Sequence, residues 1–465
     1  METAEVRPKK KKREIDMCTR PLFGKILLFF LPLAASGILQ LLYNAADIIT
    51  VGQFADHTAM AAVGSTSSLV NLIVNLFIGL SVGALSVMSR CVGAGDREKA
   101  DKVVHTSIPV GFLSGILVGI VGFFGARFFL ELMDTDELVI DQATIYLQIY
   151  FIGMPFSMIY NFGAAILRAC GDTKRPLLIL AGAGLINVAI NLWLVIAYGL
   201  GVVGVGVGTT VSQLVSAVAV LFVLCRQKGY GQFSFRRIRI HIGALKNIVR
   251  IGLPAGIQST IFSLSNVIIQ SSINSFGDIA MAGSTAAASL EGFVYTTMNA
   301  VSQACLTFTA QNYGARKFGN IRLVLAQCIG IVTVIGLIMG VGVYLLADPL
   351  LSIYNTEPEV IAFGRERLLY ACAPYFLCGL MEVLVGSIRG MGRSLLPMIF
   401  AIVAVCGVRI LWIYTFFAAQ RTLAMLFISY PVSWLAAVAM HLCTFIFVSK
   451  KVKKKLKLTE ERPAA

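Results

Sequence analysis

Residues 23–54 read FGKILLFFLPLAASGILQLLYNAADIITVGQF, and this run sets the class of fold. No charged residue lies between Lys25 and Asp47. The run is therefore long enough for a helix that crosses a bilayer, which takes about 20 mostly apolar residues. Transmembrane strands are shorter and alternate in polarity, whereas this run does not alternate. The run predicts a transmembrane helix.

Apolar runs of this kind recur along the whole chain of 465 residues, of which 57% are hydrophobic and 14% are charged. Ordinary soluble domains have about 45–50% apolar and about 25% charged residues, so a soluble globule is excluded. Division of the runs at charged residues and at Pro or Gly predicts an all-α integral membrane protein with twelve transmembrane helices. The predicted spans are residues 24–53, 58–88, 102–126, 142–167, 176–198, 201–225, 248–276, 281–310, 322–347, 361–388, 395–418 and 422–449.

The basic residues predict the orientation of these spans. Of the 39 Lys and Arg residues, 34 lie in segments on the same side as the N-terminus, and the opposite ends hold only Arg127, Arg365, Arg367 and Arg421. Cytoplasmic loops are enriched in Lys and Arg, so both termini are predicted to be cytoplasmic in a multi-pass plasma-membrane protein of a prokaryotic cell. The basic residues behind the net charge of +15 are thus expected to orient the protein in the membrane and to contact anionic lipid headgroups. No nucleic acid partner is expected.

The chain also contains an internal repeat. A shift of 221 or 222 positions places Pro32 on Pro254 and Arg168 on Arg389. Each half holds six predicted spans, an even number, so the halves share one orientation and form two pseudo-symmetric six-helix bundles. The predicted divisions are a basic cytoplasmic segment 1–20, bundles 21–225 and 248–449, a cytoplasmic linker 226–247 and a basic cytoplasmic tail 450–465. The linker is a candidate amphipathic surface helix.

Several motifs resemble those of the multidrug and toxic compound extrusion (MATE) transporters over residues 20–450. The motifs are YNAADIITVGQF at 43–54, RACGDTKRP at 168–176, INVAINLWLVI at 186–196, GVGVGTTVSQ at 204–213, QNYGA at 311–315 and RGMGRSLLP at 389–397. The resemblance implies two bundles in a V, alternating access, and export of cationic or amphipathic compounds driven by inward flow of H⁺ or Na⁺. It implies no cofactor apart from that coupling ion.

Three acidic residues lie within the predicted spans: Asp47, Glu291 and Glu382. A charged side chain at the bilayer centre costs about 3 kcal/mol or more, so an intramembrane acid indicates function by default. Burial would favour the neutral form of Asp47, which could then take up a proton on one side and release it on the other. Asp47 also matches the ion-coupling aspartate of the resembled family. The alternative is a solvated or helix-capping carboxylate near the outer surface.

Polar residues at helical spacing are predicted to surround this carboxylate. The residues predicted for ion coupling are Asp47, Asn187, Asn191 and Thr209, and those predicted to bind substrate beside them are Gln40, Asn44 and Gln213. Some family members have a second aspartate at the position of Asn191, so this chain departs from a two-carboxylate site. The choice between H⁺ and Na⁺ therefore stays open, as does a purely interhelical role for the two asparagines.

The second half supplies the other predicted substrate-binding residues, which are Gln258, Asn266, Gln270, Glu291, Met298, Glu382 and Arg409. Glu382 and Arg409 could instead form a structural ion pair inside the bundle. Glu291 is expected near the outer surface, where it would attract cations or take part in coupling.

The predicted function is secondary active multidrug efflux of cationic or amphipathic organic compounds by H⁺ or Na⁺ antiport, carried out by a monomer. The alternative is a flippase for a lipid-linked intermediate, which has a similar helical plan and should have a wider and more basic cavity. An enzyme is not expected, because the sequence shows neither a nucleophile with a base nor a metal set in one layer of the membrane.

Overall fold

The computed structural model describes residues 14–55, 57–133 and 135–460, and the elements in these ranges are helical. The α-helices are α1 (Phe23–Phe54), α2 (His57–Ala94), α3 (Arg97–Leu132), α4 (Glu137–Ile152), α5 (Met154–Ala169), α6 (Lys174–Leu192), α7 (Gly201–Arg226), α8 (Ile242–Asn274), α9 (Asp278–Gly314), α10 (Phe318–Leu345), α11 (Ala347–Leu351), α12 (Pro358–Arg367), α13 (Phe376–Gly390), α14 (Leu395–Ala401), α15 (Val408–Trp412) and α16 (Leu423–Glu460). The π-helical and 3₁₀ segments are η1 (Trp193–Ala197), η2 (Phe235–Arg237), η3 (Leu368–Cys372), η4 (Ile402–Gly407) and η5 (Ile413–Phe417). The predicted basic segments at the two ends of the chain lie partly outside the described residues.

Each predicted span falls on one helix or on one series of consecutive helices. Within the described ranges, nine helices are long and apolar enough to cross a membrane, or up to eleven if each of two bent pairs is one span. The remaining predicted span, 281–310, lies in α9, which has 37 residues and many Ser, Thr, Asn and Gln side chains. Because α9 packs against α1, α2, α10, α12 and α13, these helices shield it from lipid and it does not need an apolar surface. The all-helical membrane fold is confirmed.

The two bent spans lie at corresponding places in the two halves. Helices α4 and α5 meet at 46°, and Pro358–Cys372 meets α13 at 41°. Pro155 follows the first break and Pro374 lies in the second, where the missing backbone N–H of proline interrupts the helical hydrogen bonds. The shared bend supports the internal repeat that the sequence predicts.

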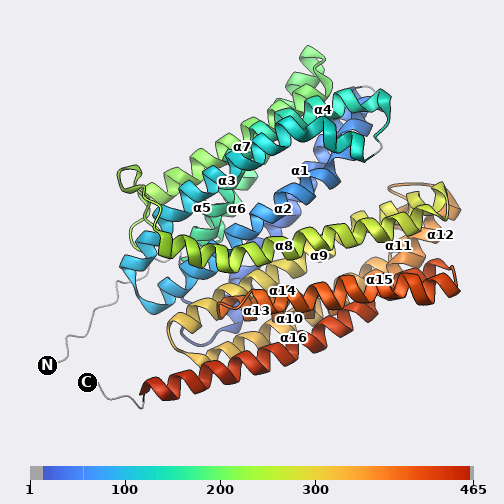
Figure 1. Ribbon diagram of the computed structural model, residues 1–465. Helices are drawn as coiled ribbons and strands as arrows, with labels where there is room; N and C mark the ends of the chain where they lie inside the picture. The colour runs from blue at the N-terminus through green and yellow to red at the C-terminus, as the bar shows by residue number, and fades with distance from the viewer. Residues whose placement is uncertain (1–13, 56, 134, 461–465) are drawn as a thin grey trace.

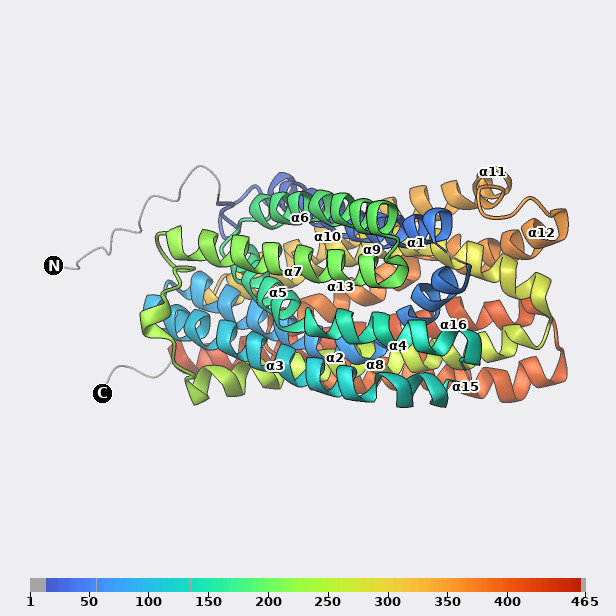
Figure 2. The same cartoon turned by 90° about the horizontal axis from the view of Figure 1, so that it is seen from above.

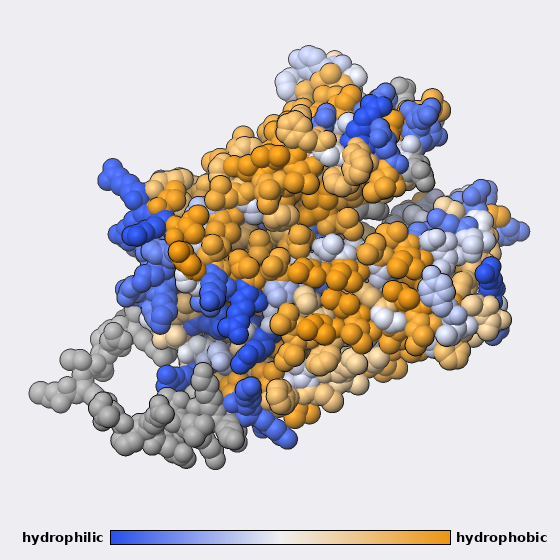
Figure 3. Space-filling model, viewed as in Figure 1, coloured by the Kyte–Doolittle hydropathy of each residue, from blue (hydrophilic) through white to orange (hydrophobic). Residues whose placement is uncertain are grey.

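The helices form two groups that converge at one end of the molecule and spread apart at the other (Figure 1). We call the end where α1 begins and α16 ends the terminal end, and the other the open end. Helices α3 to α7 lie in one arm and α9 to α16 in the other, and the helices run roughly along one axis (Figures 1 and 2). On the face shown in Figure 3, apolar side chains cover the middle, and hydrophilic side chains gather toward the two ends. This distribution fits helices that cross a bilayer.

Glycines allow the two halves to approach closely where α2 packs along α8. A methyl group on Gly256 would overlap the backbone of Leu76, and one on Gly79 would overlap the backbone of Gly256. Gly83 and Gly252 meet the same pair of helices in the same way. Small residues at such a crossing let the helix backbones touch, which is a common basis of helix association in membranes.

Gly256→Ala should therefore destabilise the protein, by about 1–3 kcal/mol for an overpacked site. Gly182→Ala is the matched control, because Gly182 lies on an exposed face of α6 and no heavy atom lies within 4 Å of an added Cβ. The control should be neutral or slightly stabilising, since alanine is the better helix former. SDS titration of both variants in mixed micelles measures the difference, and equal stability of the two would contradict the close α2–α8 contact.

The segment 14–22 closes the terminal end by bonding to both halves. The backbone N–H of Ile15 donates to the carbonyl of Gly171 at 3.2 Å, and Asn312 Nδ2 donates to the carbonyl of Met17 at 2.8 Å. Met17 and Leu22 are fully buried. Because Gly171 belongs to the first half and Asn312 to the second, this segment holds the halves together at the end where they converge.

The predicted linker 226–247 is α-helical only at its two ends, where α7 finishes and where residues 242–247 begin α8, and the rest of it is not the amphipathic helix that the sequence suggested. Residues 227–241 are irregular apart from the single 3₁₀ turn η2. They are anchored to the start of α3, where His105 Nε2 accepts from the Ser234 N–H at 3.1 Å and Phe233 stacks on the His105 ring at 5.4 Å. Gly229 has a φ of 113°, which breaks helical geometry and favours glycine. The contacts with His105 and the turn at Gly229 therefore keep this part of the linker from forming the helix that its amphipathic pattern predicts.

Candidate functional site

The first candidate site lies in the N-terminal bundle, around Asp47 on α1. Its carboxylate accepts a 2.6 Å hydrogen bond from Asn191 Nδ2 and a 3.4 Å bond from Thr209 Oγ1. Asn187, with its amide oriented so that both of its ends are bonded, donates to Asp47 Oδ1 at 3.0 Å and accepts from the backbone N–H of Thr209 at 3.2 Å. Asp47, Asn187 and Asn191 are almost fully buried. The structure thus brings all four residues predicted for ion coupling together.

Three helices position this network. Asn187 and Asn191 lie one turn apart on α6, so both face α1, and Thr209 faces them from α7. Gly208 makes the fit possible, because a methyl group there would overlap the side-chain oxygen of Asn191. The result is a buried carboxylate whose hydrogen-bond partners are neutral, held in an apolar region where its charge state can respond to its surroundings.

The structure does not bring the neighbouring predicted substrate residues into this network. Gln40 and Asn44 lie on the same helix as Asp47, but their side chains are exposed. Gln213 is half-buried on α7 and packs against Gly153, at the bend between α4 and α5. Helical spacing puts Gln40 and Asn44 on the face of α1 that holds Asp47, but this face is buried at Asp47 and exposed at the other two residues.

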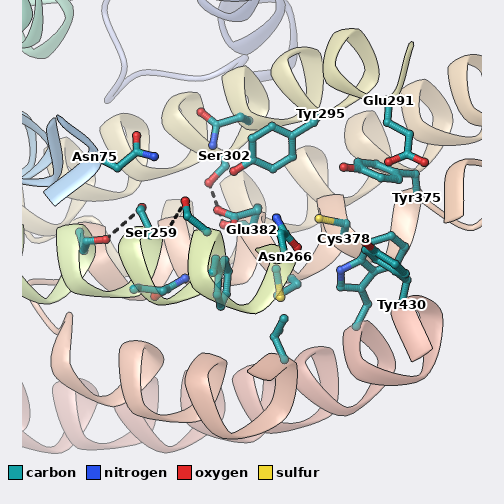
Figure 4. Close-up of a pocket in the computed structure, with 18 of the residues that line it drawn as sticks. Asn75, Ser259, Asn266, Glu291, Tyr295, Ser302, Tyr375, Cys378, Glu382 and Tyr430 are labelled. Carbon is teal, nitrogen blue, oxygen red and sulfur yellow. Dashed lines mark hydrogen bonds between the residues drawn. The ribbon is translucent and has the colours of Figure 1, made fainter. Parts of the chain in front are cut away.

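The second candidate site is a cavity of about 620 Å³ in the C-terminal bundle, bounded also by α2. Its lining includes Gln258, Asn266, Gln270, Glu291, Glu382 and Arg409 from the sequence prediction. Glu291, Tyr375 and Tyr430 lie toward one end of this cavity, Asn75 and Ser259 toward the other, and Glu382 and Asn266 between them (Figure 4). Met298 is outside the lining and packs in the core, where its sulfur would contact a Cβ on Gly379 or Gly336.

The ion pair in this cavity differs from the one that the sequence suggested. Arg367 Nε and Nη2 each donate to a different oxygen of Glu291 at 2.9 Å, and Arg367 Nη1 donates to Ser284. Both charged side chains are 8% exposed. The sequence predicts Arg367 at the outer end of a span and offers a Glu382–Arg409 ion pair as one of two alternatives. Arg367 is instead turned inward on α12, and it neutralises Glu291.

Arg409 on α15 has neutral partners. Its Nε donates to Ser433 Oγ at 3.1 Å and its Nη1 donates to Asn266 Oδ1 at 3.2 Å. The guanidinium lies 4.3 Å from the centre of the Tyr430 ring and 6.0 Å from that of Trp434. Arg409 is 4% exposed, so this charge is almost fully withdrawn from water.

A third arginine of the cavity, Arg389, was missed because the sequence places it at a helix end, where it looks like an orientation signal. The structure turns it into the lining, where its Nη2 donates to Gln258 Oε1 at 2.9 Å. Its Nε is buried and has no hydrogen-bond partner within the described ranges. Glu382 lies in the same lining, and Ser302 Oγ donates to its backbone carbonyl at 2.7 Å. The cavity therefore holds three guanidinium groups and two carboxyl groups.

The sequence profile of the MatE family matches residues 32–193 and, a second time, residues 254–415. The chain belongs to the MATE transporter family. The two matches begin 222 positions apart, which agrees with the repeat found in the sequence. Membership in the MATE family makes the protein a multi-pass membrane transporter rather than an enzyme.

Relatives and solved structures of the MATE family cover nearly the whole chain. The probable multidrug resistance protein YoeA of Bacillus subtilis (strain 168) is 27% identical over 433 residues, which are 91% of this chain and 93% of that protein. The probable multidrug resistance protein YpnP of the same organism is 28% identical over 396 residues, which are 84% of this chain and 87% of that protein. A solved structure described as the outward-facing conformation of a multidrug resistance MATE family transporter has a TM-score of 0.87 at 21% identity, and it covers 96% of this chain and 100% of that chain.

Proposed function

We propose that this MATE protein is a secondary active exporter of amphipathic organic compounds that exchanges them for H⁺ or Na⁺. The observation that carries the proposal is the buried carboxylate of Asp47 with its neutral partners Asn187, Asn191 and Thr209. A carboxyl group in such a place can be neutral or charged depending on access to water and ions. The energy is sufficient, because a membrane potential contributes about 2.3 kcal/mol per charge for each 100 mV.

The arrangement of the two halves supports alternating access as the transport route. The halves are held together at the terminal end by the segment 14–22 and spread apart at the open end (Figure 1). If the basic loops face the cytoplasm, as the distribution of Lys and Arg predicts, this conformation faces outward. The opposite conformation would require the contacts of Ile15 and Asn312 to separate while the open end closes.

Transport in reconstituted vesicles tests the proposal. Vesicles with a pH gradient alone and with a Na⁺ gradient alone are loaded with an amphipathic dye, and dye movement against its concentration is followed by fluorescence. One of the two gradients should drive export, and an ionophore that collapses that gradient should stop it. Export that continues without either gradient, or that requires ATP, would reject the antiport mechanism.

The arginines of the cavity support the alternative function, a flippase for a lipid-linked intermediate. The sequence suggested a single arginine within the spans of the second half, whereas Arg367, Arg389 and Arg409 all line the cavity. Guanidinium groups suit the phosphates of a lipid-linked intermediate. Glu291 neutralises Arg367, however, which leaves less positive charge than three arginines suggest. The same vesicles, supplied with a fluorescent lipid-linked diphosphate, distinguish the two functions by whether the lipid crosses the bilayer.

A further inference from the structure

The charge of the cavity in the C-terminal bundle indicates which part of a substrate it recognises. The Glu291–Arg367 pair is bidentate and almost fully buried, so it contributes no net charge. Glu382, Arg389 and Arg409 remain. Their formal sum is positive, and protonation of Glu382 would make it more so. The cavity is therefore built to hold negative charge rather than to attract cations.

Arg409 and Arg389 are the guanidinium groups of the described cavity lining that have no ion-pair partner, and Arg409 is the one that lies against aromatic rings. Its described hydrogen bonds go to Ser433 and Asn266, which are neutral, and no carboxylate of the described residues lies within ion-pair distance. A buried guanidinium in a membrane is costly unless something compensates for lost hydration. The ring of Tyr430 compensates in part through a cation–π contact at 4.3 Å. A bound anion would supply the rest.

The two halves differ at the position of Arg409. A shift of 222 positions places Asn187 on Arg409 and Asn44 on Asn266. In the first half the amide of Asn187 donates to a carboxylate, whereas in the second half the guanidinium of Arg409 donates to a neutral amide. The position that carries the neutral Asn187 in the first bundle thus carries a cation in the second, and the position of the carboxylate Asp47 is taken by Ile269.

The surroundings of Arg409 suit an aromatic ligand. The rings of Tyr375 and Trp434 pack edge to face at 5.0 Å, and those of Tyr430 and Trp434 at 5.6 Å. These three rings line the same cavity as Arg409. A volume of about 620 Å³ lies within the usual range for sites that hold drug-sized molecules.

We propose that this cavity binds amphipathic substrates that carry an anionic group, with a carboxylate, sulfonate or phosphate paired to Arg409 and an aromatic part against Tyr375, Tyr430 and Trp434. The proposal rests on the proposed transport function, because it names the substrate class of that function. Of the cationic or amphipathic compounds that the family resemblance implied, it selects amphipathic ones and gives them an anionic group in place of a cationic one. The anion would replace the water that Arg409 loses on burial and would bond to it as a charge-assisted pair.

The test is equilibrium binding of two dyes that share one ring system and differ in charge. Fluorescein is an anion and rhodamine 123 is a cation, and both contain the same xanthene body. The full-length protein in phosphatidylcholine nanodiscs at pH 8 is titrated with each dye, and binding is followed by fluorescence anisotropy. Wild type should bind fluorescein at least about tenfold more tightly than rhodamine 123, the scale expected for one charge-assisted contact. Tighter binding of rhodamine 123 would overturn the proposal.

Two variants assign the effect to Arg409. Arg409→Gln should lose about tenfold or more in fluorescein affinity without weakening rhodamine 123 binding, because it removes a positive charge that repels the cationic dye. Asn266→Asp keeps the arginine but places a carboxylate beside its Nη1, so it should also weaken fluorescein binding, and it decides the question if Arg409→Gln fails to fold. Arg421→Gln is the matched control, because Arg421 is exposed and lies outside the cavity lining. Unchanged fluorescein affinity in a folded Arg409 or Asn266 variant would overturn the proposal.

The assay separates this inference from the transport mechanism. Binding is measured at equilibrium with no ion gradient, so it does not depend on coupling through Asp47. Loss of gradient-driven export with retained fluorescein preference would reject antiport and leave the anion site standing. Normal antiport with a preference for rhodamine 123 would reject the anion site and leave antiport standing.

Discussion

Replacing Asp47 with Asn should reduce gradient-driven export to the rate of protein-free vesicles. The amide has nearly the shape of the carboxylate, so the packing around Asn191 and Thr209 should survive. It can neither release a proton nor offer a negative charge to Na⁺, and the coupling of ion entry to substrate exit would be lost. The measurement is the initial rate of dye export in vesicles with an imposed ion gradient.

Asp141→Asn is the control for this experiment. Asp141 is also an acidic residue of the N-terminal half, but its side chain is 73% exposed and it pairs with Arg127 at the surface. Exposed pairs of this kind contribute about 0–1 kcal/mol, so export should stay at the wild-type rate. Wild-type export by Asp47→Asn would show that the buried carboxylate is not the coupling group.

The place of Asp47 and its partners was largely predictable from the sequence. Two asparagines four residues apart in an apolar helix must share a face. In a membrane this polar face has the lowest free energy when it is buried inside the protein, away from lipid. The same argument applies to Thr209 on the next span. Their proximity to Asp47 is a long-range contact, over 144 positions for Asn191, and helical spacing alone leaves it open. Their role in coupling rests on the transport experiment.

Helical spacing does not predict which polar residues of α1 are buried. Gln40 and Asn44 share a helix face with Asp47, yet only Asp47 is buried. The face of α1 is covered by different neighbours along its length, because Gly37 meets Thr296 of α9 while Tyr43 meets Gly184 of α6. Helical periodicity fixes which residues share a face, but the partner of that face depends on contacts between distant parts of the chain.

The inward direction of Arg367 could be read from the sequence, but its pairing with Glu291 could not. Arg367 follows Arg365 and Glu366, so this stretch resembles a surface loop. Val360, Gly364 and Arg367, however, are spaced four and three apart, and all three are buried on one face of α12. That spacing could have indicated that Arg367 turns inward. Its partner could not have been found in this way, because Glu291 lies 76 positions earlier and on another helix.

Arg367→Gln should cost about 3–5 kcal/mol of stability, because it leaves the charge of Glu291 buried without its partner. Both side chains are 8% exposed, and each carboxylate oxygen of Glu291 accepts one hydrogen bond from Arg367 at 2.9 Å. The double variant Glu291→Gln/Arg367→Gln should recover much of this loss, since two amides can bond to each other and neither carries a charge. SDS titration in mixed micelles measures all three proteins.

Arg365→Gln gives a control two residues away on the same helix. Arg365 pairs with Asp348 at 3.2 Å, but its side chain is 53% exposed, so its loss should change stability by no more than about 1 kcal/mol. A double variant as unstable as Arg367→Gln would mean that shape, rather than charge pairing, makes this site important. A stable Arg367→Gln would mean that water or an ion reaches Glu291. Glu291 would then stay charged without Arg367 and could bind a substrate cation directly. This would make the buried pair part of the transport path.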